Sequence, residues 1–218
     1  MKSEILKRVF SSIIMIPIVL FFIVKGTFFF KFFMIIFLIT AAYEWNAMSK
    51  NKPYKIPGFL FLIISIILTI LFRGQTNLEL YIFLVTILIC VSTDIGGYIF
   101  GNLFKGPKIK KSISPNKTYA GSIGGYLLSI VLVYFFSQNS YLINIDQAND
   151  FGRDEFIFVL LISTISQIGD FIISLFKRKS KIKNTGSIIP GHGGILDRAD
   201  GMLFALPFAY IYLNLFTN

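Results

Sequence analysis

The sequence predicts an all-α fold, a polytopic bundle of about seven transmembrane helices with a cytoplasmic N-terminus. Hydrophobic residues make up 55% of the 218-residue chain, and the mean hydropathy of +0.72 is far above that of a soluble domain. The apolar residues form repeated runs of roughly 18–20 residues, the length that a helix needs to cross the hydrocarbon core. The basic residues gather between alternate runs, which is typical of a multi-pass membrane protein.

Each apolar run is bounded by polar or basic residues and is read as one span. The first follows MKSEILKR without a small-residue cleavage site, so it is expected to be a retained helix and not a signal peptide. Pro17 and Pro207 fall within runs and predict local kinks that neighbouring helices tolerate. The predicted spans are Val9–Val24, Phe28–Trp45, Ile56–Phe72, Leu78–Gly101, Tyr119–Phe136, Glu155–Phe176 and Met202–Phe216.

The basic residues predict the orientation. With the N-terminus inside, all but four of the 21 Lys and Arg residues fall on the cytoplasmic side, and the four exceptions are Lys25, Lys31, Arg73 and Arg153. Such an asymmetry is the usual sign of the cytoplasmic face. The net charge of +10 is therefore interpreted as a topology signal and as an attraction for anionic lipids or nucleotides, and no nucleic-acid partner is expected.

No internal repeat or soluble domain is detected, so residues 1–218 are taken as a single integral membrane domain. Residues 1–101 would hold the N-terminal spans, and residues 102–218 a C-terminal catalytic part with two basic cytoplasmic loops. Those loops, at 104–118 and 177–201, contain every cytoplasmic connection longer than a tight turn. Any active site is therefore expected on the cytoplasmic face.

Three carboxylates near the inner face are the first candidates for chemistry. Asp170 lies late in the sixth predicted span, where a charge costs about 3 kcal/mol or more near the membrane centre and so predicts a function. Its spacing places Asp170, Ser174 and Lys177 on one helical face. Asp197 and Asp200 are three residues apart and would point the same way in a helical turn. Converging carboxylates favour a Mg²⁺ site, although a helix-end Asp can also pair with a Lys or cap a helix.

The stretch PGHGGILDR lies between these carboxylates. Gly193 and Gly194 allow the backbone to approach a ligand closely, and a Gly-rich backbone beside a helix N-terminus can bind phosphate oxygens. His192 is the only His in the chain and is interpreted as a phosphate contact or proton carrier, with a structural hydrogen bond as the alternative. A single His without a Cys partner makes a zinc site improbable.

The other cytoplasmic loop, KGPKIKKSISPNKTYAG, repeats the combination of lysines, hydroxyls and glycines. Ser114 and Pro115 predict a turn, and Lys117 and Thr118 would lie at the entrance to the fifth span. Alone, this loop could be only a basic tether; with the second loop it would form the other half of an anion pocket. Asp94, inside the fourth span, needs a partner, and a facing Lys is expected.

Together these residues offer carboxylates for a divalent ion, cations for several phosphates and a position in the bilayer. No G-x-x-x-x-G-K-[ST] motif, serine nucleophile elbow or two-histidine metalloprotease motif is present. The combination predicts phosphoryl or nucleotidyl transfer to a lipid.

The C-terminal stretch resembles the signature of the phosphatidate cytidylyltransferases, also called CDP-diacylglycerol synthases. The QIGD that ends at Asp170 and the SPNKT element at 114–118 also resemble family features. Two positions depart from the family pattern, with Asn184 and Ala120 where acidic residues are usual. The matching signature residues are Ser174, Phe176, Lys177, Arg178, Lys183, Gly186, Pro190, His192, Gly193, Gly194, Asp197, Arg198 and Asp200.

The resemblance implies a Mg²⁺-dependent reaction of CTP with phosphatidate that gives CDP-diacylglycerol and pyrophosphate. Asp170, Asp197 and Lys177 would be catalytic, and Asp170, Asp197 and Asp200 would hold Mg²⁺, with a second cation left open. Ser114, Lys117 and Thr118 would hold the lipid phosphate or the nucleotide, and Asp94 would support the site. The residues implied for CTP and its phosphates are Ser174, Arg178, Lys183, His192, Gly193, Gly194 and Arg198.

The implied partners are CTP, phosphatidate and membrane lipids, with a homodimer left open, and the implied location is the bacterial inner membrane. The alternative enzyme is a CTP-dependent lipid kinase that acts on a polyprenyl or phytyl alcohol with the same machinery. A small anion or lipid transporter is a third interpretation. Transporters usually show repeated halves and broken helices at mid-membrane, whereas the polar residues here gather on one face.

Overall fold

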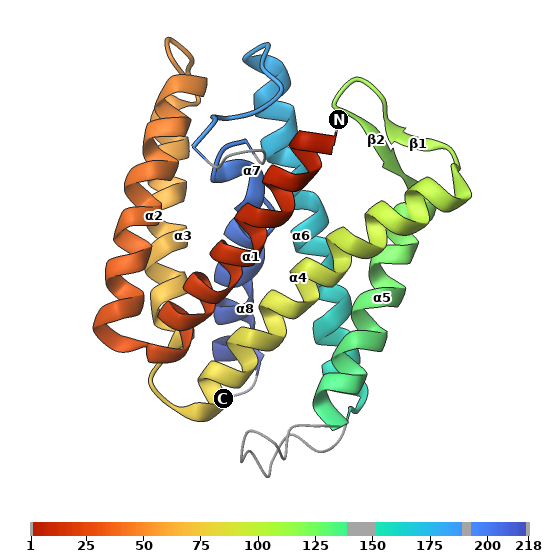
Figure 1. Cartoon of the computed structure of the whole chain (residues 1–218). Coiled ribbons are helices and arrows are strands. Elements are labelled where there is room, and N and C mark those ends of the chain that lie inside the picture. The colour runs from red at the N-terminus through yellow and green to blue at the C-terminus, as the bar shows by residue number, and fades with distance from the viewer. Residues whose placement is uncertain (1, 139–150, 189–192, 217–218) are drawn as a thin grey trace.

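The computed structural model describes residues 2–138, 151–188 and 193–216, which form eight helices and one two-stranded hairpin (Figure 1). Long helices dominate because the apolar runs contain few helix-breaking residues. A helix also pairs its backbone N–H and C=O groups internally, as an apolar environment requires. The elements are α1 (Lys2–Lys25), α2 (Thr27–Met48), α3 (Lys55–Arg73), α4 (Asn77–Phe104), β1 (Lys108–Lys110), β2 (Ser114–Thr118), α5 (Tyr119–Gln138), α6 (Arg153–Lys179), α7 (Leu196–Ala199) and α8 (Met202–Phe216).

The seven predicted spans all coincide with helices, which confirms the all-α polytopic class. Five of these helices, α2 to α6, are long and apolar enough to cross a membrane. The first and last are shorter as apolar helices, at Ile13–Lys25 and Met202–Phe216. Pro17 and Pro207 lie inside α1 and α8 as expected. The number of spans and their orientation stay predictions.

The helices run alternately up and down, so the connections that carry most basic residues gather at one end. Figure 1 places the N-terminus, the α2–α3 turn, the hairpin and the segment after α6 at the same end. This arrangement agrees with the alternate sorting of lysines and arginines in the sequence. It brings together connections that are far apart along the chain.

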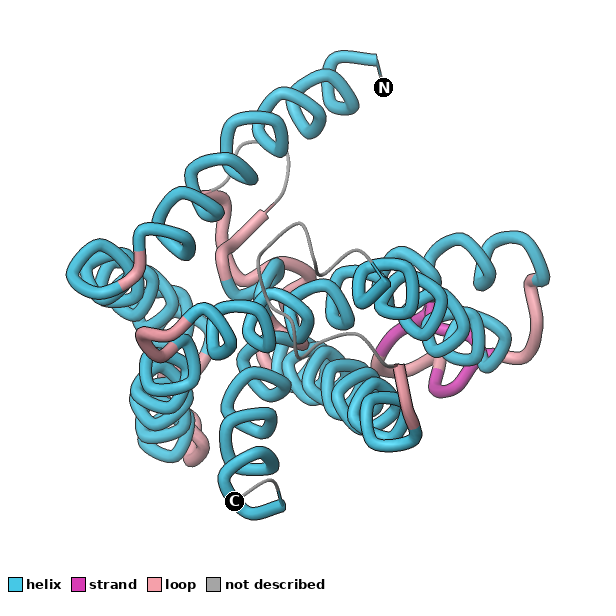
Figure 2. The backbone as a smooth tube through the Cα atoms, turned by 90° about the horizontal axis from the view of Figure 1, so that it is seen from below, coloured by secondary structure: helices cyan, strands magenta, loops and turns pink. Residues whose placement is uncertain are grey.

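A short hairpin forms where the sequence predicted only a basic loop. β1 and β2 pair antiparallel, with Lys108 opposite Thr118 and Lys110 opposite Ser114. The strands, magenta in Figure 2, lie on one side of the bundle. Arg178 of α6 donates from Nε to the Ile113 carbonyl at 3.1 Å, and this bond ties the hairpin turn to the helix that carries Asp170.

Glycines allow α4 and α5 to pack with their backbones almost in contact. A Cβ built on Gly96 would lie 2.5 Å from the Gly124 carbonyl oxygen, and one on Gly125 would lie 2.8 Å from the Thr93 carbonyl oxygen. No side chain fits at either distance, so only glycine permits this approach. The close packing holds the Asp94 segment of α4 beside the first turns of α5.

The last helix is tied into the bundle by apolar packing and one interhelical hydrogen bond. α8 packs against α3, α4 and α6, and Leu203 and Ala209 on it are fully or almost fully buried. Ser65 of α3 donates from Oγ to the Leu203 carbonyl at 2.7 Å. This contact fixes the end of α8 that directly follows Asp200.

Candidate active site

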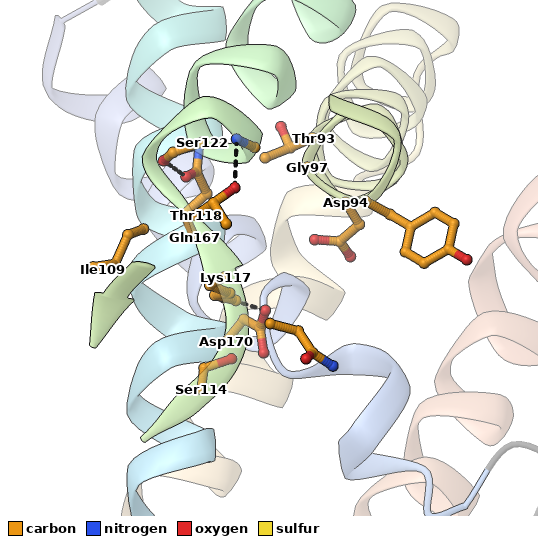
Figure 3. Close-up of a pocket in the computed structure, with 13 residues that line it drawn as sticks. Thr93, Asp94, Gly97, Ile109, Ser114, Lys117, Thr118, Ser122, Gln167 and Asp170 are labelled. Atoms are coloured by element: carbon orange, nitrogen blue, oxygen red, sulfur yellow. Dashed lines mark hydrogen bonds and ion pairs between the residues drawn. The ribbon is translucent and has the colours of Figure 1, made fainter. Parts of the chain in front are cut away.

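A polar cavity of about 300 Å³ lies between α4, the hairpin, α5 and α6. It joins three regions that the sequence singled out separately: Asp94, the SPNKT strand and the QIGD end of α6 (Figure 3). Its lining combines carboxylates, hydroxyls, amides and one ammonium. The lining residues are Thr93, Asp94, Gly97, Tyr98, Ile109, Ser114, Asn116, Lys117, Thr118, Gly121, Ser122, Gln167 and Asp170.

Lys117 and Asp170 form an ion pair across this cavity, between Nζ and Oδ2. Their side chains point toward each other from β2 and α6, and Asp94 faces them from α4 (Figure 3). The charges that act on Asp94 include those of Asp170, Lys117 and Arg198. Lys117 thus faces Asp94, as the sequence predicted, while its ion pair is with Asp170.

Polar side chains of α4, α5 and α6 form a hydrogen-bonded chain beside this pair. Ser122 donates to Oε1 of Gln167, and Thr93 donates to the Ser163 hydroxyl at 2.8 Å. The sequence interpretation missed Ser122 and Gln167. Gln167 lies one turn before Asp170, and that spacing on one helical face was a signal that could have identified it.

A second cluster surrounds Lys177 near the end of α6. Its Nζ lies 2.8 Å from Oδ1 of Asp197 and 3.7 Å from Oδ2 of Asp200. Lys177 is only 8% exposed, so both carboxylates share one buried ammonium. The prediction that Asp197 and Asp200 point the same way is confirmed.

The two carboxyls differ in their electrostatic surroundings. Burial alone would raise the pKa of Asp197, but the hydrogen bond and charge of Lys177 and the amides of Thr185 and Gly194 outweigh it, so that pKa is lowered. Burial, followed by the charge of Asp170 and a hydrogen bond with it, raises the pKa of Asp200 well above its ordinary value. Asp200 therefore links the Lys177 cluster to Asp170 in the polar cavity.

Glu44 of α2 is a buried acid that the sequence interpretation missed. It is 1% exposed and accepts hydrogen bonds from the Ile195 amide at 2.8 Å and the Leu196 amide at 2.9 Å. The Thr185 hydroxyl donates to it at 2.8 Å. One carboxylate thus holds both the segment after α6 and the start of α7. A lone acid near the end of an otherwise apolar span was the available signal.

The glycines of the signature segment make room for Glu44. A Cβ on Gly194 would lie 2.1 Å from Oγ1 of Thr185 and 2.5 Å from Oε2 of Glu44. Gly193 has φ of +90°, a conformation that other residues rarely adopt. The Gly194 amide also donates to Asp197 at 3.1 Å, beside the Thr185 amide at 2.8 Å. The close backbone approach expected of these glycines is therefore made to the acids Glu44 and Asp197.

Several other residues were predicted to contact phosphate, and the structure shows different contacts for some of them. Arg178 uses Nε and Nη1 for the carbonyls of Ile113 and Ile182. Thr118 accepts the Gly121 amide at 3.0 Å and so caps α5. Ser174 is buried and Lys183 is exposed. His192 lies outside the described residues.

The carboxylates allow a partial test of the predicted Mg²⁺ site. In the described ranges, no group of three Asp, Glu, His or Cys side chains is close enough to form a complete metal site. Asp170 is close enough to act on the pKa of Asp200 by charge and hydrogen bonding, whereas Asp197 has both oxygens engaged by Lys177 and backbone amides. Two adjacent carboxyls fit Mg²⁺, which is usually bound by one or two carboxylates together with waters and substrate phosphates.

Comparison with known proteins gives one consistent family. A family model described as "Cytidylyltransferase family" matches residues 6–79 and 58–216. A phosphatidate cytidylyltransferase of Rickettsia typhi is 34% identical over 216 residues, which cover 94% of this chain and 90% of the relative. Proteins of the same name from Staphylococcus haemolyticus and Bacillus subtilis are 41% and 40% identical over 180 and 141 residues, covering 78% and 63% of this chain and 64% and 48% of those relatives.

Proposed function

The chain belongs to the cytidylyltransferase family, and on that premise we propose that it is a phosphatidate cytidylyltransferase. It would transfer CMP from CTP to phosphatidate, giving CDP-diacylglycerol and pyrophosphate, in the inner membrane of a bacterium. The relatives that cover most of the chain carry that name. The active site would be the polar cavity together with the Lys177 cluster.

One observation carries the proposal: two sets of lysine–carboxylate pairs are coupled electrostatically through Asp170 and Asp200. Lys117 pairs with Asp170 on one side, and Lys177 pairs with Asp197 and Asp200 on the other. The joined set has ammonium groups for two phosphate-bearing substrates and lies at the basic end of an apolar bundle. Such a site suits a reaction between a nucleotide from water and a lipid from the bilayer.

In the proposed reaction, a phosphate oxygen of phosphatidate attacks the α-phosphorus of CTP. A new P–O bond forms, the bond between the α-phosphorus and the bridging oxygen breaks, and that oxygen leaves with pyrophosphate. The nucleophile is already an anion, so no serine or cysteine nucleophile is needed. The main barrier is the repulsion between two anions, which fixed positive charges reduce.

The two lysines would divide this task. Lys117, on the hairpin, would exchange its pairing with Asp170 for a substrate phosphate. Lys177 is buried with Asp197 and Asp200 and would keep a fixed positive charge where negative charge develops. Gln167 and Ser122, already hydrogen-bonded to each other, would orient polar groups of the substrate in the cavity.

Asp170 and Asp200 would hold Mg²⁺, with Asp94 near them and Asp197 positioning Lys177. Bound there, the ion would neutralise charge on the phosphates and polarise the α-phosphorus. This assignment keeps Asp170 and Asp200 from the predicted ligand set and gives Asp197 a supporting role.

The labelling pattern of the lipid product tests the proposal. Purified protein would be incubated with Mg²⁺, phosphatidate and CTP labelled at the α-phosphate, and separately with CTP labelled at the γ-phosphate. We expect α-label in the lipid and release of pyrophosphate, with Asp170→Asn inactive. Transfer of γ-label to a polyprenyl or phytyl alcohol would instead identify the lipid kinase. No transfer of either label by the wild-type protein would contradict both enzymes.

A further inference from the structure

A second cavity, of about 250 Å³, shares no lining residue with the polar cavity. Helices α1, α2, α3, α4 and α8 line it with apolar side chains, among them Phe30, Met34, Phe83 and Leu206. The Thr69 hydroxyl in its wall donates to the Ser65 carbonyl at 2.8 Å, so its proton is already used in a hydrogen bond within α3. We call this space the apolar cavity.

The apolar cavity extends along the bundle. On α2 its lining runs from Phe30 to Phe37, a rise of about 10 Å at 1.5 Å per residue. One end is formed by Ile195 and Ala199 at α7, near the end of the bundle that carries the basic connections (Figure 1). The other end lies toward the α1–α2 turn. A long, narrow apolar space of this kind suits an aliphatic chain.

Among the described residues that line the apolar cavity, one carries a charge, and it lies at the α7 end. Arg198 contributes to the lining, and its charge also acts on Asp94, which lines the polar cavity. Arg198 is exposed, so its guanidinium is accessible at this end of the apolar cavity. A ligand with an anionic head and an aliphatic tail matches this distribution of charge and apolar surface.

We propose that the apolar cavity binds one acyl chain of phosphatidate, with the lipid phosphate held by Arg198. This inference rests on the proposed function for the fate of the headgroup, and it assigns Arg198 to the lipid in place of CTP. Arg198 directly follows Asp197 of the Lys177 cluster in α7, so a phosphate at Arg198 would lie near the proposed active site. The apolar cavity would then select long-chain lipids, and the bound acyl chain would set how deep the phosphate lies in the bundle.

A tryptophan that fills the cavity tests the chain site by its dependence on acyl length. Ile87 lines the cavity on α4, and Val91, one turn on, is 39% exposed and lies outside the lining. For Ile87→Trp we expect KM for dioleoyl phosphatidate to rise about tenfold, because the cavity cannot hold both the indole ring and the acyl chain. KM for dihexanoyl phosphatidate and for CTP should change little, and Val91→Trp should behave as wild type. Equal KM changes for both lipids, or the same effect in Val91→Trp, would overturn the inference.

Photolabelling tests the same site without turnover. Wild-type protein in phosphatidylcholine vesicles would be irradiated with a phosphatidate that has a diazirine at one chain end, or with phosphatidylcholine bearing the same chain. We expect the phosphatidate probe to label peptides containing Met34 and Ile87, and Arg198→Met to reduce that label. Equal labelling by both probes, or label on lipid-facing side chains such as Val91, would contradict the proposal. If wild-type protein labels the cavity but transfers no α-phosphate label, the proposed function fails and the chain site stands.

Discussion

Glu44 and Thr185 are 141 positions apart, and a 2.8 Å hydrogen bond joins their side chains in the protein interior. The same carboxylate accepts the amides of Ile195 and Leu196. The N-terminal spans therefore do more than anchor the chain, because one of them orders the segment that presents Asp197. This contact connects the part of the chain with the weakest sequence signal to the part with the strongest.

Removal of Glu44 should disorder the signature segment. Glu44→Ala leaves two buried donors and one partly buried donor without an acceptor, at about 1–3 kcal/mol for each unsatisfied buried group. We expect kcat to fall about 100-fold, as for a small displacement of catalytic groups, and the thermal unfolding midpoint to fall as well. Glu44→Gln, which keeps one acceptor oxygen, should give intermediate values of both.

Glu79 provides the matched control for Glu44. It forms a capping box with Thr76 at the start of α4, away from the site. Glu79→Gln should cost about 1 kcal/mol of stability without a change in kcat. An equal loss of kcat in the Glu44 and Glu79 variants would show that Glu44 has only a general structural role.

Replacement of Lys117 should separate substrate binding from metal binding. In Lys117→Met, Asp170 loses its ion-pair partner, so we expect Mn²⁺, used as a probe for Mg²⁺, to bind more tightly in an electron paramagnetic resonance titration. Turnover should nevertheless fall about 100-fold because a cation that binds phosphate is gone. Lys108→Met on the exposed first strand is the control. Unchanged Mn²⁺ affinity in Lys117→Met would contradict a metal at Asp170.

Asp197 and Lys177 should behave as a buried pair. Asp197→Ala should abolish turnover while the protein still inserts, and it should lower the unfolding free energy by about 3–5 kcal/mol because Lys177 loses its main partner. The double variant Asp197→Ala/Lys177→Met should recover part of that stability and none of the activity. A double variant no more stable than Asp197→Ala would contradict the pairing. Denaturant unfolding in detergent and the labelled-CTP assay measure the two properties.

Gly194 should tolerate no side chain. The methyl group of Gly194→Ala would collide with Thr185 and Glu44, and we expect loss of activity together with a lower unfolding midpoint. Gly106→Ala is the control, since its nearest neighbour would be the Ala120 Cβ at an ordinary 3.6 Å. Wild-type activity in Gly194→Ala would show that the segment adapts and that Glu44 does not fix it.

The sequence predicted much of the fold because apolar periodicity and the placement of lysines are local signals. Asp170, Lys177, Asp197 and Asp200 could be identified for the same reason, since each is a charge beside or within an apolar run. Glu44 shows the same local signal, but its role was missed because its backbone partners are amides about 150 residues away, which no local pattern records. The hairpin was missed because three- and five-residue strands, one with a proline, are too short to show alternation.

The hydrogen bond between Ser65 and the Leu203 carbonyl, just after Asp200, bears on biogenesis. The ribosome would make α8 after α1 to α7, and Asp200 lies two residues before its start, so a nascent chain that still lacks α8 cannot hold this acid near Asp170. Glu44 would likewise enter the membrane before its backbone partners exist, because those amides are made 151 and 152 positions later. Competence to react would therefore arise only once α8 has packed into the bundle, and chains that still lack α8 would be inactive.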